Sequence, residues 1–200
     1  MYSLRRPSET VIRAFLAAQS RHDFSYPAVG ATRGPGSGRS LAPPRGCVLD
    51  HNRVRIGVGE DAFTRARRAL SRWRMFEVGW AELLWPDAQI ETGTVVALLA
   101  RGAGLWTLNA ARIVYTVDEF AEAEEIERFG FAYGTLPGHV ARGEERFSIE
   151  WSREDNGVWY DVLAFSRPRL PARLAYPYTR ALQRRFARDS LAALGRAVAD

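Results

Sequence analysis

The stretch that decides the fold is RLAYPYTRALQRRFARDSLAALGRAV, residues 173–198. One set of apolar residues repeats every four positions: Leu174, Tyr178, Leu182 and Phe186, continuing towards Ala193 or Leu194. A second set at the same interval is basic: Arg180, Arg184 and Arg188. This spacing predicts a long amphipathic helix from about residue 173 to 198, with an apolar face against the rest of the domain and a solvated arginine face.

The residues before this helix predict an antiparallel sheet. Apolar positions alternate in several segments, and turn-forming residues such as Gly, Pro, Asp and Asn separate them. Short links between consecutive strands are typical of a meander. The six predicted strands cover residues 81–85, 94–100, 105–117, 129–133, 145–151 and 158–165.

The first third of the chain adds two helices and one strand. Residues 8–20 are predicted to be a helix with Ser8 as the N-cap, because apolar residues recur there at helical spacing. Residues 34–46, rich in Gly and Pro, form a flexible surface loop. A strand over residues 48–58 places Val54, Ile56 and Val58 on one face, and a helix follows from residue 60 to about 76.

Together these elements predict one α+β domain over residues 1–200, with residues 48–198 as its core. We expect a helix-grip-like antiparallel sheet of about seven strands, wrapped on the long C-terminal helix, with an extra N-terminal helix. A cavity can open between such a bent sheet and the helix that it holds.

Composition bounds the class of protein. The chain is 46% hydrophobic and 26% charged, and its single cysteine, Cys47, excludes an internal disulfide framework. We therefore expect a cytoplasmic protein without a transmembrane segment. Every basic residue is arginine, and the charge is segregated: residues 167–196 hold eight arginines and one acid, whereas residues 118–127 hold six acids and no base.

Several chemistries lack their motifs. The chain has no phosphate-binding P-loop, no dinucleotide fingerprint and no Gly-x-Ser-x-Gly elbow. His22, His51 and His139 are scattered, so we expect no metal site and no cofactor. Cys47 has no nearby partner that would make it a nucleophile. Nucleic-acid binding through the arginine face is not expected, because no recognition motif accompanies it.

Short motifs over most of the chain form a specific pattern. They are FSYP (24–27), VGATR (29–33), WRMF (73–76), GLW (104–106), RIVY (112–115), FGFAYGTLPGH (129–139), GEERF (143–147), WY (159–160) and FSRP (165–168). On these residues the chain resembles uncharacterised protein family 0548, found in bacteria and plants, which implies no established activity. The order of elements is also similar to that of the START and Bet v 1-like (SRPBCC) superfamily, which includes polyketide cyclases.

The turn between two predicted strands holds candidate catalytic groups. His139 follows a Pro-Gly turn, and Glu144 and Glu145 begin the next strand. A histidine beside a carboxylate can shuttle a proton near neutral pH. The alternative is a solvated turn histidine, with the two glutamates paired to Arg142 or Arg146.

Candidate ligand-binding residues lie on the strands. Strand alternation places Asn109 and Tyr115 on one side of residues 105–117, and Trp106 and Arg112 on the other. Polar groups in these apolar rows need a partner or water, so either pair is a candidate to line a cavity. The structural alternative is a buried ion pair between Arg112 and Asp161. Tyr133 and Tyr160 add aromatic contact area, although an ordinary core uses such residues too.

The function predicted from the sequence is binding of a small apolar or amphipathic ligand in an interior cavity. One alternative is a cyclase or hydro-lyase type of enzyme in the same cavity. The other is an interaction module that meets a protein or nucleic-acid partner through the arginine-rich helix.

Overall fold

The computed structural model describes residues 1–33, 43–85, 87–168 and 176–199. Strands β2 to β8 form one antiparallel sheet in the order β2-β8-β7-β6-β5-β4-β3, and β1 pairs with β5 outside this path. The elements are β1 (Tyr2–Ser3), α1 (Glu9–Gln19), η1 (Ala31–Arg33), β2 (Val48–Val58), α2 (Gly59–Ser71), η2 (Arg74–Phe76), β3 (Ala81–Leu84), β4 (Val95–Gly102), β5 (Leu105–Ala121), η3 (Glu122–Glu124), β6 (Ile126–Thr135), β7 (Ala141–Ser152), β8 (Gly157–Pro168) and α3 (Tyr176–Ala199).

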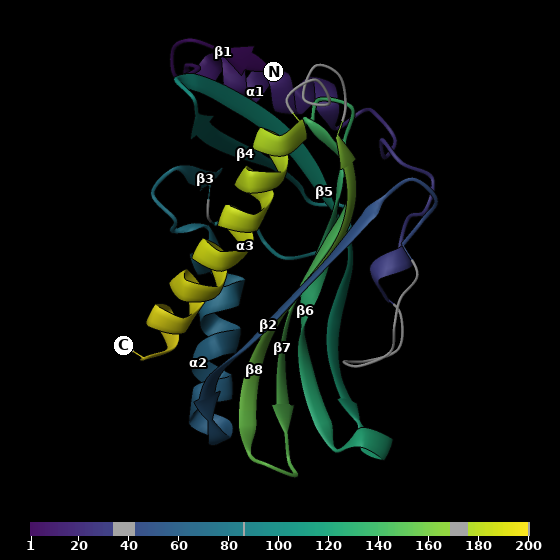
Figure 1. The fold of residues 1–200 in the computed structure, drawn as a ribbon, viewed down its shortest axis with the longest axis vertical. Helices are drawn as coiled ribbons and strands as arrows, with labels where there is room; N and C mark the ends of the chain where they lie inside the picture. Colours follow the sequence, from purple (N-terminus) through teal and green to yellow (C-terminus); the bar gives the residue numbers. More distant parts are fainter. Residues whose placement is uncertain (34–42, 86, 169–175, 200) are drawn as a thin grey trace.

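The predicted fold class is confirmed: the protein is a curled antiparallel sheet held on a long C-terminal helix. Strands β3 to β8 follow one another as a meander, and β2 joins the sheet beside β8 (Figure 1). We call the face that packs against α2 and α3 the concave face, and the opposite face the convex face. Figure 1 shows α3 lying across the open side of the curled sheet.

The strands β5 and β6 are longer than predicted. The acidic residues 118–127 belong to the tip of their hairpin, where β5 continues to Ala121 and β6 begins at Ile126. The sequence of this tip shows no alternation of apolar and polar residues, because charged side chains lie on both faces of the hairpin. Arg67 of α2 balances part of that charge, with its guanidinium 2.8 Å from Asp118.

The predicted ranges of α1 and β2 agree with the structure, with one correction in β2. The Ser8 side chain caps α1 by accepting a hydrogen bond from the N–H of Val11. In β2 the register with β8 shifts between Arg55 and Gly57, which breaks the alternation of side chains. Val58, predicted to share a face with Val54 and Ile56, is therefore exposed.

The helix predicted over residues 60–76 ends earlier, at Ser71. Trp73 adopts a left-handed backbone conformation (φ 56°, ψ 24°), and the short helix η2 follows. The Trp73 indole N–H donates to the carbonyl oxygen of Ala88 at 2.9 Å, which fixes this turn. The sequence predicted a longer helix because Trp73 and Phe76, which follow it, are apolar and are buried in the same core.

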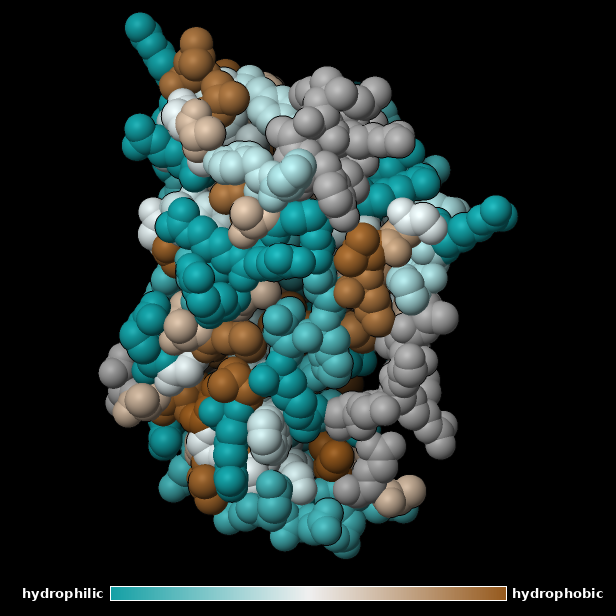
Figure 2. Space-filling view, viewed as in Figure 1, coloured by the Kyte–Doolittle hydropathy of each residue, from teal (hydrophilic) through white to brown (hydrophobic). Residues whose placement is uncertain are grey.

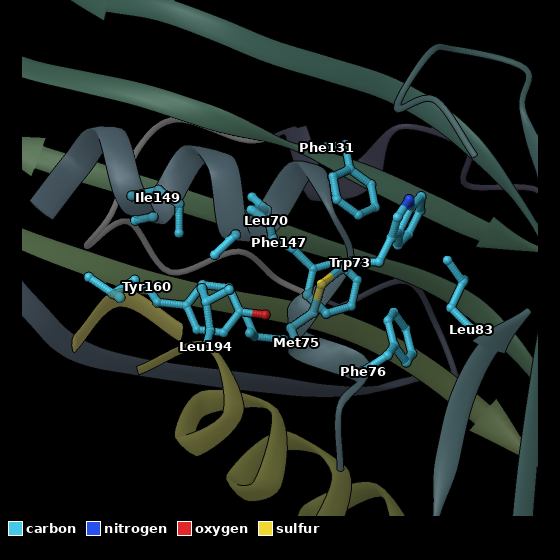
Figure 3. Close-up of a cluster of buried hydrophobic side chains, with 14 of the residues drawn as sticks. Leu70, Trp73, Met75, Phe76, Leu83, Phe131, Phe147, Ile149, Tyr160 and Leu194 are labelled. Carbon is cyan, nitrogen blue, oxygen red and sulfur yellow. The ribbon is translucent and has the colours of Figure 1, made fainter. Parts of the chain in front are cut away.

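The main core lies between α2, η2 and the concave face of the sheet (Figure 3). The Trp73 and Phe131 rings meet edge to face, with centroids 4.7 Å apart. Leu194 and Val198 add the C-terminal half of α3 to this core. Burial of these side chains is what holds the C-terminal helix against the sheet.

Helix α3 begins at Tyr176, and Leu174 lies outside the described residues. Phe186 packs on Phe76 with ring centroids 5.2 Å apart, as expected for the apolar face, but Tyr178 is 43% exposed. The arginine face is not uniformly solvated, because Arg180 forms two hydrogen bonds of 2.7 Å to Asp50 of β2. No helix in the described part of the chain is long and apolar enough to cross a membrane.

The fold predicts opposite effects of alanine at two glycines. A Cβ at Gly130 would lie 2.3 Å from the carbonyl oxygen of Phe147 in the paired strand β7, so Gly130→Ala should lower the free energy of unfolding by about 1–3 kcal/mol. A Cβ at Gly195 in α3 would lie 4.0 Å from Ile56, an ordinary contact, so Gly195→Ala should raise it by roughly 0.5–1 kcal/mol. Urea denaturation measures both, and equal effects would contradict this packing.

Candidate functional site

A cavity of about 490 Å³ lies between α3 and the concave face of the sheet. Its walls come from β2, β4 to β8, the turn after β6 and the N-terminal two thirds of α3. Most of the lining is apolar, including Phe76, Leu98, Val162, Leu182 and Ala187. On the outer face shown in Figure 2, apolar residues form small separate areas among polar ones, so the larger apolar surfaces are turned inward.

Glu145 and Tyr133 form a polar pair in this cavity. They sit opposite each other on the neighbouring strands β7 and β6, and the Tyr133 hydroxyl donates to Glu145 Oε2 at 2.7 Å. Strand alternation places both side chains on the concave face. Burial raises the pKa of Glu145 to about 7; the nearby Asp50 carboxylate raises it further, and the Tyr133 hydrogen bond opposes the shift.

Asp50 also lines the cavity, but its charge is balanced. Arg180 of α3 binds its carboxylate through both guanidinium nitrogens, and the arginine side chain is 13% exposed. Asp50 therefore lines the cavity as part of a fixed ion pair. Glu145, by contrast, accepts a hydrogen bond from the Tyr133 hydroxyl, and no cation among the described residues pairs with it.

Glu144, the neighbour of Glu145 in β7, has its carboxylate engaged elsewhere although it also borders the cavity. Oε2 accepts from the Tyr26 hydroxyl and from the N–H of Gly30, each at 2.7 Å. Oε1 accepts from the N–H of Thr32 at 2.9 Å and from its hydroxyl. These bonds fix residues 26–32 against the convex face, and burial beside this carboxylate raises the pKa of Tyr26.

His139 lines the cavity at the turn between β6 and β7. Its Nδ1 atom accepts a hydrogen bond from the N–H of Ala141 at 3.0 Å, so a neutral ring carries its proton on Nε2. The structure brings His139 and Glu145 to the same cavity. It directs the Glu144 carboxylate to Tyr26 and Thr32 instead, so the proposed partnership of His139 with Glu144 has no direct support.

Of the six candidate ligand-binding residues, Asn109 and Tyr133 line the cavity. Asn109 is fixed by its neighbours, since its side-chain oxygen accepts from the N–H of Val140 at 3.1 Å. Tyr160 is fully buried beneath α3, with its hydroxyl 3.1 Å from Ser190 Oγ. Trp106 borders a separate groove near β3, and Arg112 donates to the carbonyl oxygen of Ser20 at 2.8 Å.

Tyr115 lies on the convex face, so the prediction that it shares a side with Asn109 is wrong. The pairing of β5 with β6 shifts register between Ile113 and Tyr115, and this irregularity reverses the alternation after Ile113. The Tyr115 hydroxyl is 2.8 Å from Thr32 Oγ1, and burial raises its pKa to about 12. One inserted residue thus moves this tyrosine to the other face of the sheet.

The convex face also holds a buried network of charges. Asp161, which the structural alternative paired with Arg112, is bound instead by Arg146 at 3.0 Å and by His51 Nε2 at 2.6 Å. Glu150 is bound by Arg128 at 3.3 Å and also by Arg53. The alternative pairing of Glu144 or Glu145 with Arg146 is therefore wrong. These ion pairs satisfy the charges within the fold, consistent with a structural role.

Sequence reasoning placed the cavity between the sheet and the C-terminal helix but named no ligand-binding residue from β2 or α3. Asp50 and Asn52 share the concave face with Val54, and this alternation was visible in the sequence. On α3, Leu182 belongs to the apolar row predicted from the sequence, whereas Ala187 lines the cavity from outside that row. Among the described residues, no three potential metal-ligating side chains gather in one place, and burial raises the pKa of the Cys47 thiol.

Residues 25–193 match the family model described as "Domain of unknown function (DUF1990)". The chain belongs to this family. A UPF0548 protein of Deinococcus radiodurans is 38% identical over 212 residues, covering 98% of each chain. Another from Dictyostelium discoideum is 34% identical over 200 residues, covering 95% of this chain and 92% of the relative. A third comes from Arabidopsis thaliana, so DUF1990 proteins occur in bacteria, amoebae and plants.

Solved structures share the chain path at low sequence identity. A hypothetical protein from Helicobacter pylori has a TM-score of 0.49 and 12% identity, over 80% of this chain and 97% of that one. Ara h 8.0201 has a TM-score of 0.43 and 14% identity, over 76% of this chain and 98% of that one.

Glu144→Gln should destabilise the DUF1990 fold. The amide nitrogen would face donors that now meet a carboxylate oxygen, so residues 26–32 would lose the two hydrogen bonds that this oxygen accepts. We expect the free energy of unfolding to fall by about 2–4 kcal/mol, measured by urea denaturation. The matched control is Glu154→Gln in the exposed turn after β7, with a change of about 0.5 kcal/mol or less. Equal effects would show that the Glu144 carboxylate does not hold this segment.

The raised pKa of Glu145 predicts a pH dependence of stability. Its ordinary pKa of 4.5 rises to about 7 in the folded state, so the folded protein binds the proton more tightly than the unfolded chain. The resulting stabilisation is complete below pH 4.5 and is lost as pH rises through 7. We expect roughly 2 kcal/mol of difference between wild type and Glu145→Gln in their change from pH 5 to pH 8, after allowance for solvent in the cavity. Parallel stability curves for the two proteins would contradict the shift.

Proposed function

We propose that this protein binds a small apolar or amphipathic molecule in the cavity between the curled sheet and α3. The observation that carries the proposal is the cavity of about 490 Å³, with its mostly apolar lining and a few polar groups. Ligand sites commonly combine these two features, because apolar walls supply affinity and polar groups fix orientation. Asn109, Tyr133 and Glu145 are the polar residues that we propose to orient the ligand, and the cytoplasm is the compartment that we propose for it.

One observation favours an enzyme in the same cavity as the second candidate. A carboxyl group whose pKa lies near 7 is suited to give and take protons at neutral pH, and Glu145 has this property. His139 lines the same cavity and could exchange a proton with the same ligand. A reaction of the cyclase or hydro-lyase type would use these two residues, with Tyr133 holding the Glu145 carboxyl in place.

An interaction module built on the arginine face of α3 has less support. Arg180 is bound to Asp50, and Arg188 is bound to Asp189 at 3.0 Å. These ion pairs reduce the positive charge that α3 offers to a polyanion. We therefore do not propose nucleic acid as a partner.

Filling the cavity should abolish ligand binding. Ala187 lines the cavity on α3, and a phenyl ring there would occupy space that a ligand needs. We expect Ala187→Phe to weaken binding of a neutral apolar fluorescent probe at least about tenfold, the cost of losing contacts worth about 1.4 kcal/mol. Ala192→Phe, on the exposed side of the same helix, is the matched control and should bind the probe like wild type.

Native mass spectrometry of the purified protein tests the same proposal without a chosen probe. A retained small molecule in wild type that is absent from Ala187→Phe supports binding in the cavity. Failure of wild type to take up apolar or amphipathic compounds by either method would overturn the proposed function.

A further inference from the structure

The charge of Glu145 is balanced by no residue in the described part of the chain. Tyr133 donates one hydrogen bond to Oε2, and this neutral hydroxyl is the group that stabilises the carboxylate. Oε1 remains available to a molecule in the cavity. A carboxylate in such a site requires either a proton or a cation from outside the chain.

The groups around Glu145 come from every element that packs near the cavity. From β2, Asp50 adds negative charge, although Arg180 binds it. From β8, Tyr160 adds a hydroxyl that is turned to Ser190 of α3. From the turn after β6, His139 directs Nδ1 to a backbone N–H. Among these groups, the Asp50 carboxylate is the charge that acts on the pKa of Glu145, and it raises that pKa.

The remaining arginines of α3 that line the cavity are at its rim. Arg184 and Arg188 are exposed, and Arg188 is bound to Asp189. Neither is among the groups whose charge acts on Glu145. Solvent screens exposed charges much more than buried ones, so the interior of the cavity keeps its acidic character.

We propose that the ligand of this cavity carries a protonated amine, which binds between Glu145 and the Tyr133 hydroxyl while its apolar body lies along Phe76, Leu98 and Leu182. This inference rests on the proposed function and names the chemical class of its ligand. An ammonium group supplies the cation that Glu145 lacks and donates to Oε1. A ligand carboxylate at the same place would meet the Glu145 carboxylate, which no described cation balances, and would be repelled.

Matched amine and alcohol ligands test the proposal. A neutral fluorescent probe is bound to the protein, and octylamine or 1-octanol is then used to displace it. We expect octylamine to displace the probe at about tenfold lower concentration than octanol, because charge-assisted hydrogen bonds are roughly twice as strong as neutral ones. In Glu145→Gln this preference should fall to within about twofold, whereas Glu154→Gln should keep it.

Proton release gives a second, independent readout. Binding of an ammonium group stabilises ionised Glu145, so the carboxyl proton passes to the buffer. At pH 7 about half of the Glu145 side chains carry that proton, and up to about half a proton should be released for each octylamine bound. Calorimetry in phosphate and in Tris measures the release, and octanol should release none. The affinity for octylamine should increase from pH 6 to pH 8.

The outcomes separate the two proposals. Binding of probe and octanol without preference for octylamine would overturn the amine proposal and leave the proposed function intact. A preference that persists in Glu145→Gln would also overturn it. No binding of any of the three compounds would overturn both. If Glu145→Gln fails to fold, proton release by wild type decides the question alone.

Discussion

The structure depends on the way in which α3 is held at its two ends. Its C-terminal half is buried against α2 and the sheet through Leu194 and Val198. Its N-terminal half is held by the pairing of Arg180 with Asp50, by a 3.0 Å hydrogen bond from Gln183 to Ser166 and by the packing of Phe186 on Phe76. Residues Thr179 to Leu191 of the helix include its contribution to the cavity wall, and the cavity lies between them and the sheet. A helix packed by apolar contacts along its whole length would leave no such space.

Two consecutive glutamates show how strand alternation separates structural from binding chemistry. Glu144 and Glu145 have the same side chain and adjacent backbone positions, but they serve opposite faces of β7. Glu144 accepts four hydrogen bonds from residues 26–32, which leaves its carboxylate fully engaged within the fold. Glu145 accepts one, and burial without a cation shifts its pKa towards neutrality. The number of donors, and not the residue type, distinguishes the two roles.

The sequence allowed the elements and their order to be predicted, because periodicity and turn residues are local signals. It predicted β2 to the residue and the cap at Ser8, and the order of strands followed from short connections. The predictions failed where a single residue alters the backbone. The register shift before Tyr115 moves that side chain to the other face of the sheet, and the left-handed turn at Trp73 follows the end of α2. The partners of buried charges could not be predicted from the sequence either, because pairing across strands depends on their register. Asp161, for example, is bound by Arg146 and not by Arg112. The cavity depends on how far α3 stands from the sheet, which no local pattern records.

The binding of Glu144 to residues 26–32 has a consequence for the evolution of this family. Tyr26, Gly30 and Thr32 share a single carboxylate that lies more than a hundred positions further along the chain. A change at position 144 removes the acceptor for all of them at once, whereas a change at Tyr26 or Thr32 removes one donor. Selection should therefore hold position 144 more tightly than either of its side-chain donors, and lineages that replace the glutamate should have rebuilt the whole segment 26–32 around the new residue.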